Sequence, residues 1–283
     1  MKIVNRILQN SFATIFFADE KAKTIPQLLD ENGNVTVILT SWKRNYLEEQ
    51  ILSLLNQSVL PSQIWLVKYL KHQNLDSILR KYPFINLIDS SVDFKYFGRF
   101  AMALFVKTKY AWILDDDIIP GRLWLENACH SCEEENAIIS SAGRRIPPNT
   151  YFLGNRDEIE KYYFGDISKG VNYNYNSVQV EVDFGCNSWF IKSEWISTFW
   201  QVQPATLEMA EDMHLSVAAL LKLGVKTIVL RQTTLEDTGN LKINYGRDAF
   251  ASWTKPDFYQ IRESVLRYLI DKLKWKPMLW ESD

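Results

Sequence analysis

The sequence predicts an α/β protein with a mixed, mostly parallel central sheet flanked by helices. Short β-branched runs that carry almost no charge alternate with segments of helical periodicity, and such runs are typical of buried parallel strands. A strand, a helix and a second strand follow one another within about 33 residues, the length of a βαβ unit. With 283 residues, 47% of them hydrophobic, the chain has ample material for a large core.

The first half of the chain carries this alternation most clearly. Residues 1–32 are expected to form an N-terminal extension that ends at the turn signal Asn32-Gly33. A buried strand is predicted over Val35–Thr40. The elements expected after it are a helix over 46–57, a strand over 63–67, a helix over 75–82, a strand over 85–88, a helix over 101–108 with Leu104 and Phe105 on its apolar face, and a strand over 110–114.

The second half is less regular. Residues 146–182 are rich in Tyr and Asn and have no helical periodicity, which favours a substrate loop or a β-ribbon. The other elements expected are a helix over 121–135, a strand over 137–140, two strands within 180–191 separated by a tight bend at Gly185, a helix over 208–223 capped by Gly224, a strand over 225–230 and a helix over 257–274.

Three carboxylates stand together where a buried strand ends. The strand Tyr110–Leu114 is followed directly by Asp115-Asp116-Asp117. Adjacent anions repel one another, so without a cation they cost stability and raise their pKa values. Ligands of open α/β sheets bind at the carboxyl ends of the strands. The triplet therefore predicts a metal site, with a solvated turn as the alternative. Two positive charges, Arg144 and Arg145, are expected at the carboxyl end of the strand over 137–140.

Several motifs follow one another along the chain. They are the strand Val35–Thr40 followed within four residues by Arg44, then Arg99, the run Ile113–Asp117, the strand that ends in Asp183-Phe184-Gly185-Cys186-Asn187, and Glu211-Asp212 at a helix start. In this order and spacing, from about Val35 to Val229, the chain resembles the nucleotide-sugar-dependent glycosyltransferases of the GT-A fold. It is most similar to the exostosin-type catalytic domain. The segment after Leu230 departs from the family, and Arg247 is the one candidate there for a catalytic Arg.

The resemblance implies how a donor would be bound. Asp117 would hold a divalent metal, Mn²⁺ or Mg²⁺, and Asp115 would reach the ribose or the sugar, with Asp116 between them. The remaining donor-binding positions would be Thr40, Arg44 and Arg99, the two arginines acting through charge-assisted hydrogen bonds. For these arginines a surface or ion-pair role is the alternative.

The resemblance also implies a catalytic pair and an organisation of the chain. Asp212 would act as the base of an inverting enzyme or as the orienting group of a retaining one, with Glu211 as its helper; acidic residues that only complement the helix dipole are the alternative. A single domain is expected, because no repeat or linker interrupts the chain. Its parts would be a nucleotide-binding half over 33–145, an acceptor-binding half over 146–230 and a C-terminal tail and helix over 231–283.

The function implied is metal-dependent transfer of a sugar from a nucleoside-diphosphate sugar, a UDP-sugar by analogy, to a hydroxyl of a glycan acceptor. Two alternatives stay open. A nucleotidyltransferase also uses strand-end carboxylates and a metal, but it normally carries a Gly-rich loop, and Thr40–Arg44 contains no Gly. A non-catalytic glycan-binding protein would keep an aromatic cleft and would bind no nucleotide with a metal.

Composition limits the classes of partner and the cellular location that we expect for this protein. A formal net charge of -2 and a pI near 6.0 predict no nucleic-acid partner. The three cysteines, Cys129, Cys132 and Cys186, are expected to be ordinary thiols rather than a disulfide framework. Neither a signal peptide nor a membrane span is convincing near the N-terminus, which favours a cytoplasmic protein. The aromatic and basic tail Lys272–Trp280 suggests peripheral contact with a membrane surface.

Overall fold

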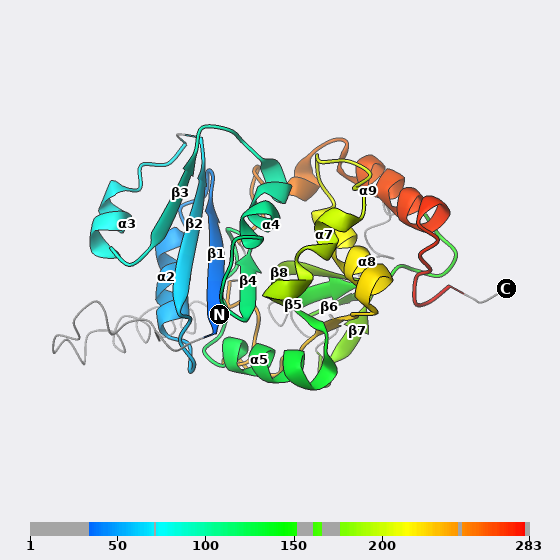
Figure 1. Ribbon diagram of the computed structural model, residues 1–283, viewed down its shortest axis with the longest axis horizontal. Coiled ribbons are helices and arrows are strands. Elements are labelled where there is room, and N and C mark those ends of the chain that lie inside the picture. The colour runs from blue at the N-terminus through cyan, green and yellow to red at the C-terminus, as the bar shows by residue number, and fades with distance from the viewer. Residues whose placement is uncertain (1–33, 71, 152–160, 166–175, 243–244, 281–283) are drawn as a thin grey trace, which may run out of the picture.

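A single mixed sheet forms the centre of the computed structural model, which describes residues 34–70, 72–151, 161–165, 176–242 and 245–280 (Figure 1). Its order is β3-β2-β1-β4-β8-β5-β9-β7, with β6 paired to β5. The strands are β1 Val35–Ser41, β2 Gln63–Tyr69, β3 Asn86–Ser90, β4 Tyr110–Leu114, β5 Ile138–Arg144, β6 Tyr163–Phe164, β7 Val180–Val182, β8 Phe184–Lys192 and β9 Thr227–Val229.

Strand direction confirms the mixed, mostly parallel sheet. Strands β1, β2, β3 and β4 are mutually parallel, and β8 is antiparallel to both of its neighbours, β4 and β5. Strand β9 is parallel to β5, while β7 and β6 are antiparallel to the strands they pair with. Strands β1 to β5 and β9 therefore all run the same way.

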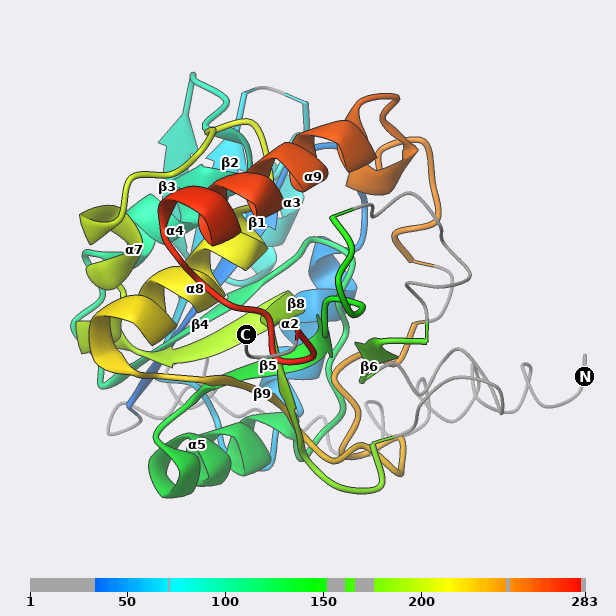
Figure 2. The same ribbon diagram turned by 90° about the vertical axis from the view of Figure 1, so that its right-hand side faces the viewer.

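Helices lie on both sides of the sheet. Helix α4 packs on β1 and β4, α5 packs on β5 and β8, α8 packs on β8, and α7 packs on α8. In Figure 2 the helices α7, α8 and α9 lie above the strands and α5 lies below them. The helices are α2 Leu47–Leu55, α3 Asp76–Lys81, α4 Gly98–Ala103, α5 Trp124–Glu135, α7 Thr198–Gln201, α8 Glu211–Leu223 and α9 Phe258–Arg267, which continues as a π-helical turn over Tyr268–Lys272.

Two hydrophobic clusters make up the core. The larger one surrounds β1 and β4, whose side chains are all buried, and includes Trp112 stacked on Trp124 with ring centroids 4.7 Å apart. The smaller cluster joins α8 to α9 through Met213, Val217 and Leu266. Burial of this continuous apolar surface is the dominant favourable term in folding.

Pairing of β1 with both β2 and β4 brings their carboxyl ends to one edge of the sheet. Val35 is opposite Tyr110 and Ile38 is opposite Ile113, so the residues that follow both strands emerge side by side. This edge is the usual ligand site of an open α/β sheet. The strand-end positions of Thr40 and Asp115 therefore follow from strand register.

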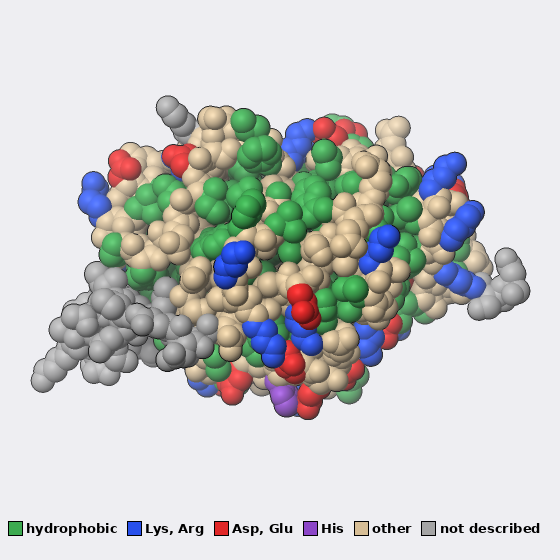
Figure 3. All heavy atoms as spheres, in the orientation of Figure 1, with side chains coloured by type: hydrophobic (Ala, Val, Ile, Leu, Met, Phe, Trp, Pro, Cys, Tyr) green, Lys and Arg blue, Asp and Glu red, His purple; other side chains and the backbone are tan. Residues whose placement is uncertain are grey.

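The prediction of a helix over 101–108 is wrong in its bounds. Helix α4 ends at Ala103, and the amides of Leu104 and Phe105 donate to carbonyls three residues back, which tightens the chain into turns. Leu104 and Phe105 are 44% and 63% exposed rather than on a buried face. Hydrophobic side chains gather over α4 and α7 on the face drawn in Figure 3.

The bend expected at Gly185 also lies elsewhere. The break between β7 and β8 is at Asp183, and Gly185 is inside β8, opposite Gly143 of β5. A Cβ at Gly185 would lie 2.5 Å from the hydroxyl oxygen of Ser140. Close approach of the two strands, and not a turn, is therefore the reason for this glycine.

Other expectations have mixed outcomes. The extension over 1–32 lies outside the described residues, as does about half of the 146–182 segment; the described part of that segment includes β6, a short strand paired with β5. All three cysteines are free thiols. In the tail, Trp275 is 4% exposed, Trp280 donates to the Pro147 carbonyl and Met278 is 41% exposed, and contact of this tail with a membrane stays a prediction. None of the described helices is long and apolar enough to cross a membrane.

Candidate active site

The aspartate triplet follows β4 at the edge of the sheet where β1 also ends. Its loop is anchored by backbone contacts: the Asp115 amide donates to the Asn187 carbonyl at 2.9 Å. The side-chain amide of Gln50, from α2, donates to the carbonyls of Asp115 and Ile118 at 2.7 and 3.0 Å. Gln50 is 1% exposed, so the loop is tied to the body of the protein.

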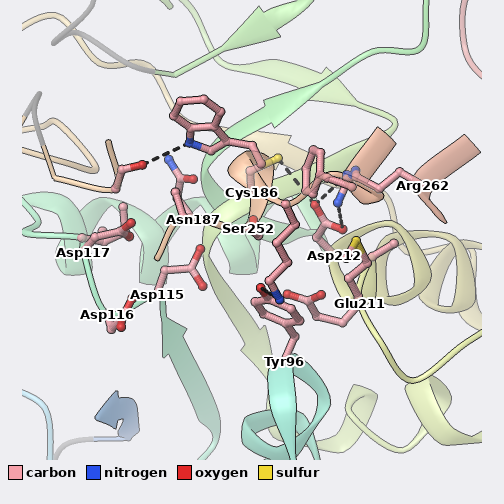
Figure 4. Close-up of a pocket in the computed structure, with 18 of the residues that line it drawn as sticks. Tyr96, Asp115, Asp116, Asp117, Cys186, Asn187, Glu211, Asp212, Ser252 and Arg262 are labelled. Carbon is pink, nitrogen blue, oxygen red and sulfur yellow. Dashed lines mark hydrogen bonds and ion pairs between the residues drawn. The ribbon is translucent and has the colours of Figure 1, made fainter. Parts of the chain in front are cut away.

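Glu211 and Asp212 begin α8, on the other side of the same cavity. Figure 4 shows Asp115, Asp116 and Asp117 on one side and Glu211 and Asp212 on the other. The cavity holds about 390 Å³. Its wall includes every donor-binding, metal-binding and catalytic position expected from the sequence: Thr40, Arg44, Arg99, Asp115, Asp116, Asp117, Glu211 and Asp212, together with Arg247.

Arg44 holds the triplet from the loop after β1. Its Nη1 lies 2.5 Å from Asp116 Oδ1 and 3.0 Å from Asp117 Oδ2. Its Nε and Nη2 donate to the two oxygens of Asp248 at 2.9 and 3.1 Å. The segment that carries Asp248 covers the triplet closely, because a Cβ added to Gly246 (φ +72°) would lie 2.3 Å from Asp117 Oδ2. Arg44 thus forms ion pairs with Asp116, Asp117 and Asp248, and its contact with a donor stays a prediction.

Arg99 bridges the two acidic groups. This side chain is 5% exposed; its Nη1 donates to Asp115 and its Nη2 donates to Glu211 Oε1 at 2.9 Å. The guanidinium also lies 4.9 Å from the Trp189 ring, which shields it from water. Burial, together with the negative charge of Asp212, raises the pKa of Glu211 to about 7 despite the opposing effect of Arg99.

Arg262 of α9 grips Asp212 with two hydrogen bonds. Its Nη1 and Nη2 donate to Oδ1 and Oδ2, each at 2.9 Å. Oδ1 also accepts the Met213 amide at 2.8 Å, and the Cys186 thiol lies 3.9 Å from Oδ2. Residue 210 before the helix is an alanine with φ +66°, an uncommon conformation that orients the first turn. Figure 4 shows Arg262 pointing at Asp212 from the side opposite the triplet.

The triplet carries more negative charge than its partners balance. Burial and the charges of Asp115 and Asp116 raise the pKa of Asp117 to about 7, although Arg44 acts in the opposite direction. Burial also raises the pKa of Asp115. A divalent cation would relieve this excess, and carboxylate oxygens are the ligands that Mn²⁺ and Mg²⁺ accept. Within the described ranges, no group of three or more His, Cys, Asp or Glu side chains forms a metal site by itself.

Sequence reasoning missed two residues of this site, Asp248 and Arg262. Both belong to the segment after Leu230, which departs from the family pattern. Asp248 lies 204 positions from Arg44, and Arg262 lies 50 positions from Asp212. No local pattern marks either residue; the only signal was that the triplet and Asp212 needed partners.

Comparisons with known proteins support the fold. No protein-family model and no curated protein matches the chain. A crystal structure of S. aureus TarS 1–349 is similar, with a TM-score of 0.51 and 14% identity over 71% of this chain and 59% of that one. A structure of TarS (36% of that chain covered) and one of TarS 1–349 in complex with UDP (59%) each give a TM-score of 0.49, again with 14% identity over 71% of this chain. The chain thus spans less than two thirds of the length of each TarS structure, and the likeness shows a shared α/β fold.

Proposed function

We propose that this protein is a metal-dependent glycosyltransferase, which moves a sugar from a nucleoside-diphosphate sugar to a hydroxyl of a glycan acceptor. One observation carries the proposal: the aspartate triplet at the end of β4 faces Glu211 and Asp212 of α8 across a single cavity. A donor at one wall and an acceptor at the other would meet between them. The resemblance of the motifs to GT-A glycosyltransferases, and the shared fold with TarS, are consistent with this arrangement.

The triplet is suited to the diphosphate end of a donor. Asp117 would hold Mn²⁺ or Mg²⁺, which as a Lewis acid supplies neutralisation of the charge that develops on the leaving diphosphate. Asp115, the most exposed of the three with 29% of its side chain accessible, would contact the ribose or sugar. Arg44 keeps Asp116 and Asp117 in place through its ion pairs with both carboxylates. Thr40 lines the same wall.

Asp212 would act on the acceptor. In the reaction, the bond between the anomeric carbon and the diphosphate oxygen breaks, and its electron pair leaves with the nucleotide. The acceptor oxygen bonds to the anomeric carbon and loses its proton, which Asp212 takes in an inverting enzyme. A carboxylate offers about four acceptor positions, and Arg262 and the Met213 amide occupy three of them, so one position on Oδ2, on the side of Cys186, is left for a hydroxyl. In a retaining enzyme the same carboxylate would orient the acceptor.

A ligand panel tests the proposal. Melting temperature is measured with UDP, GDP and CDP, with their sugars, and with the corresponding nucleoside triphosphates, each with and without Mn²⁺. We expect one nucleoside diphosphate to stabilise the protein, more strongly with the metal, and UDP is the first choice through the resemblance alone. Stabilisation by nucleoside triphosphates alone would favour the nucleotidyltransferase.

Two variants test whether the metal-dependent shift in melting temperature arises at the aspartate triplet. Asp117→Asn should remove the metal-dependent part of the shift, whereas Asp89→Asn, at an exposed carboxylate on β3 that does not line the cavity, should leave it unchanged. Product anomeric configuration, read by NMR, then separates inversion from retention. The proposal fails if no nucleotide stabilises the protein under any of these conditions.

A further inference from the structure

Basic side chains line the cavity in addition to those that pair with its catalytic carboxylates. The carboxylates of the triplet and of the start of α8 each contact Arg44, Arg99 or Arg262. The other basic side chains of the cavity wall are Lys95, Arg144, Arg145, Arg247 and Lys255. Lys95 is paired with Glu208. The remaining four are not needed to balance the carboxylates of the catalytic pair.

Arg144 and Arg145 are two of these cations, and neighbouring groups orient each of them. Arg144 ends β5, and its guanidinium carbon lies 4.7 Å from the centre of the Tyr163 ring. Arg145 donates its Nε to the Glu181 carbonyl at 2.9 Å, which leaves the terminal nitrogens available. In the part of the chain that the structure describes, neither guanidinium forms an ion pair with a carboxylate.

Nearby acidic groups do not account for the two arginines. Asp183 is close enough for Arg145 to influence its pKa, yet both of its oxygens accept backbone amides, from Ile146 at 2.7 Å and Met278 at 2.9 Å. On the other side, Arg144 influences the pKa of Cys186, whose thiol lies beside Asp212. Both arginines therefore line the cavity wall, Arg144 on the side of Cys186 and Arg145 on the side of Glu181 and Asp183.

We infer that Arg144 and Arg145 form a subsite for a phosphoryl group in this cavity. Arg144 and Arg145 are half-buried at the end of β5, and both line the cavity. A guanidinium presents fork-shaped donors that match phosphate oxygens, and its hydrogen bonds to phosphate are charge-assisted. This inference rests on the proposed function, which puts a phosphorylated ligand in the cavity. The phosphoryl group belongs either to the diphosphate of the donor or to an anionic acceptor.

Calorimetric titration distinguishes the two sources. The probes are inorganic pyrophosphate, the nucleoside diphosphate selected by the panel, and the corresponding nucleoside. The variants are Arg144→Gln and Arg145→Gln, with Arg231→Gln as the matched control, because Arg231 is exposed and contacts only Thr233 among described residues. Thermal unfolding of each variant verifies that it is folded.

A subsite for the donor predicts that both variants bind pyrophosphate and the nucleoside diphosphate about tenfold or more weakly, while the nucleoside binds as before. A subsite for the acceptor predicts unchanged binding of the nucleoside diphosphate, together with loss of the pyrophosphate that binds to the nucleotide-saturated enzyme. Failure of wild type to bind pyrophosphate, or equal binding by wild type and variants, overturns the inference. If the panel finds no nucleotide, the proposed function fails, and the pyrophosphate comparison still decides on the subsite.

Discussion

At the residue scale, Glu211 is a catalytic candidate that is almost completely removed from water. It is 7% exposed, it receives one hydrogen bond from Arg99, and it has the negative charges of Asp212 and Asp115 close by. Burial disfavours its charged form, and these two neighbours act in the same direction. The pKa of about 7 follows, against an ordinary value of 4.5.

This pKa predicts how stability depends on pH. The folded protein binds the Glu211 proton more tightly than the unfolded chain, so this contribution to stability is complete below about pH 4.5 and is lost as the pH rises through 7. Glu211→Gln cannot ionise. Its melting temperature relative to wild type should therefore increase, by about 2 °C or more, between pH 5 and pH 8.

The control is Glu194→Gln at an exposed position, which should show no such trend. Melting curves of the three proteins at several pH values test the prediction. A constant difference between Glu211→Gln and wild type at all pH values would contradict it.

At the element scale, helix α9 brings Arg262 to the site. Val265 and Leu266 are buried against α8, which sets the orientation of the helix and leaves Arg262 facing Asp212. The Arg262 guanidinium lies 5.2 Å from the Phe184 ring of β8, so three elements converge on this side chain. A charge pair held in this way restricts the Asp212 carboxylate to one orientation, which a catalytic group needs.

Loss of this grip should affect turnover more than donor binding. We expect Arg262→Gln to lower kcat by about 10- to 100-fold with little change in the KM for the donor, because Arg262 contacts Asp212 and not the triplet. Arg262→Lys keeps the charge but not the bidentate geometry, and it should recover only part of the activity.

A steady-state assay that follows release of the nucleoside diphosphate gives both kcat and the KM for the donor. Gln260→Ala, an exposed position on the same helix, is the control and should keep wild-type values. An unaltered kcat in Arg262→Gln at unchanged melting temperature would show that the pairing has no role in turnover.

At the scale of the whole molecule, the cavity lies where the two hydrophobic clusters meet. Trp189 belongs to the larger cluster and Phe184 to the smaller one, and both line the cavity wall. The relative placement of the triplet and of Asp212 therefore depends on both clusters. The smaller cluster is the one that docks the C-terminal helix.

Leu266 of α9 is 0% exposed in the smaller cluster, so its side chain helps to dock the C-terminal helix. Leu266→Ala should reduce the free energy of unfolding by about 2–5 kcal/mol, since it removes buried methyl groups and leaves a cavity. Leu220→Ala, at a position on α8 that is 39% exposed, should cost less than about 1 kcal/mol. Urea unfolding of both variants measures the difference, and equal midpoints would refute it.

The sequence by itself determined the frame of the site. Its strands were predictable because runs such as Val35–Thr40 and Tyr110–Leu114 are too apolar to lie anywhere but inside. Parallel strands end at one edge, so the register alone places Thr40 and the triplet together. The shift of the helix predicted over 101–108 shows the limit: local periodicity does not reveal where a tight turn exposes an apolar face.

Only the tertiary structure decided which charges pair. Arg44 with Asp248, and Arg262 with Asp212, join segments that are 204 and 50 positions apart, so neither pair has a local pattern. These two pairs form only when the C-terminal segment docks on the rest of the protein. Burial of apolar side chains drives that docking, and an apolar pattern does not specify which surface the segment will contact. Hydrophobic periodicity thus fixes where strands and helices form, whereas the partner of a buried charge is set by packing that only the folded chain provides.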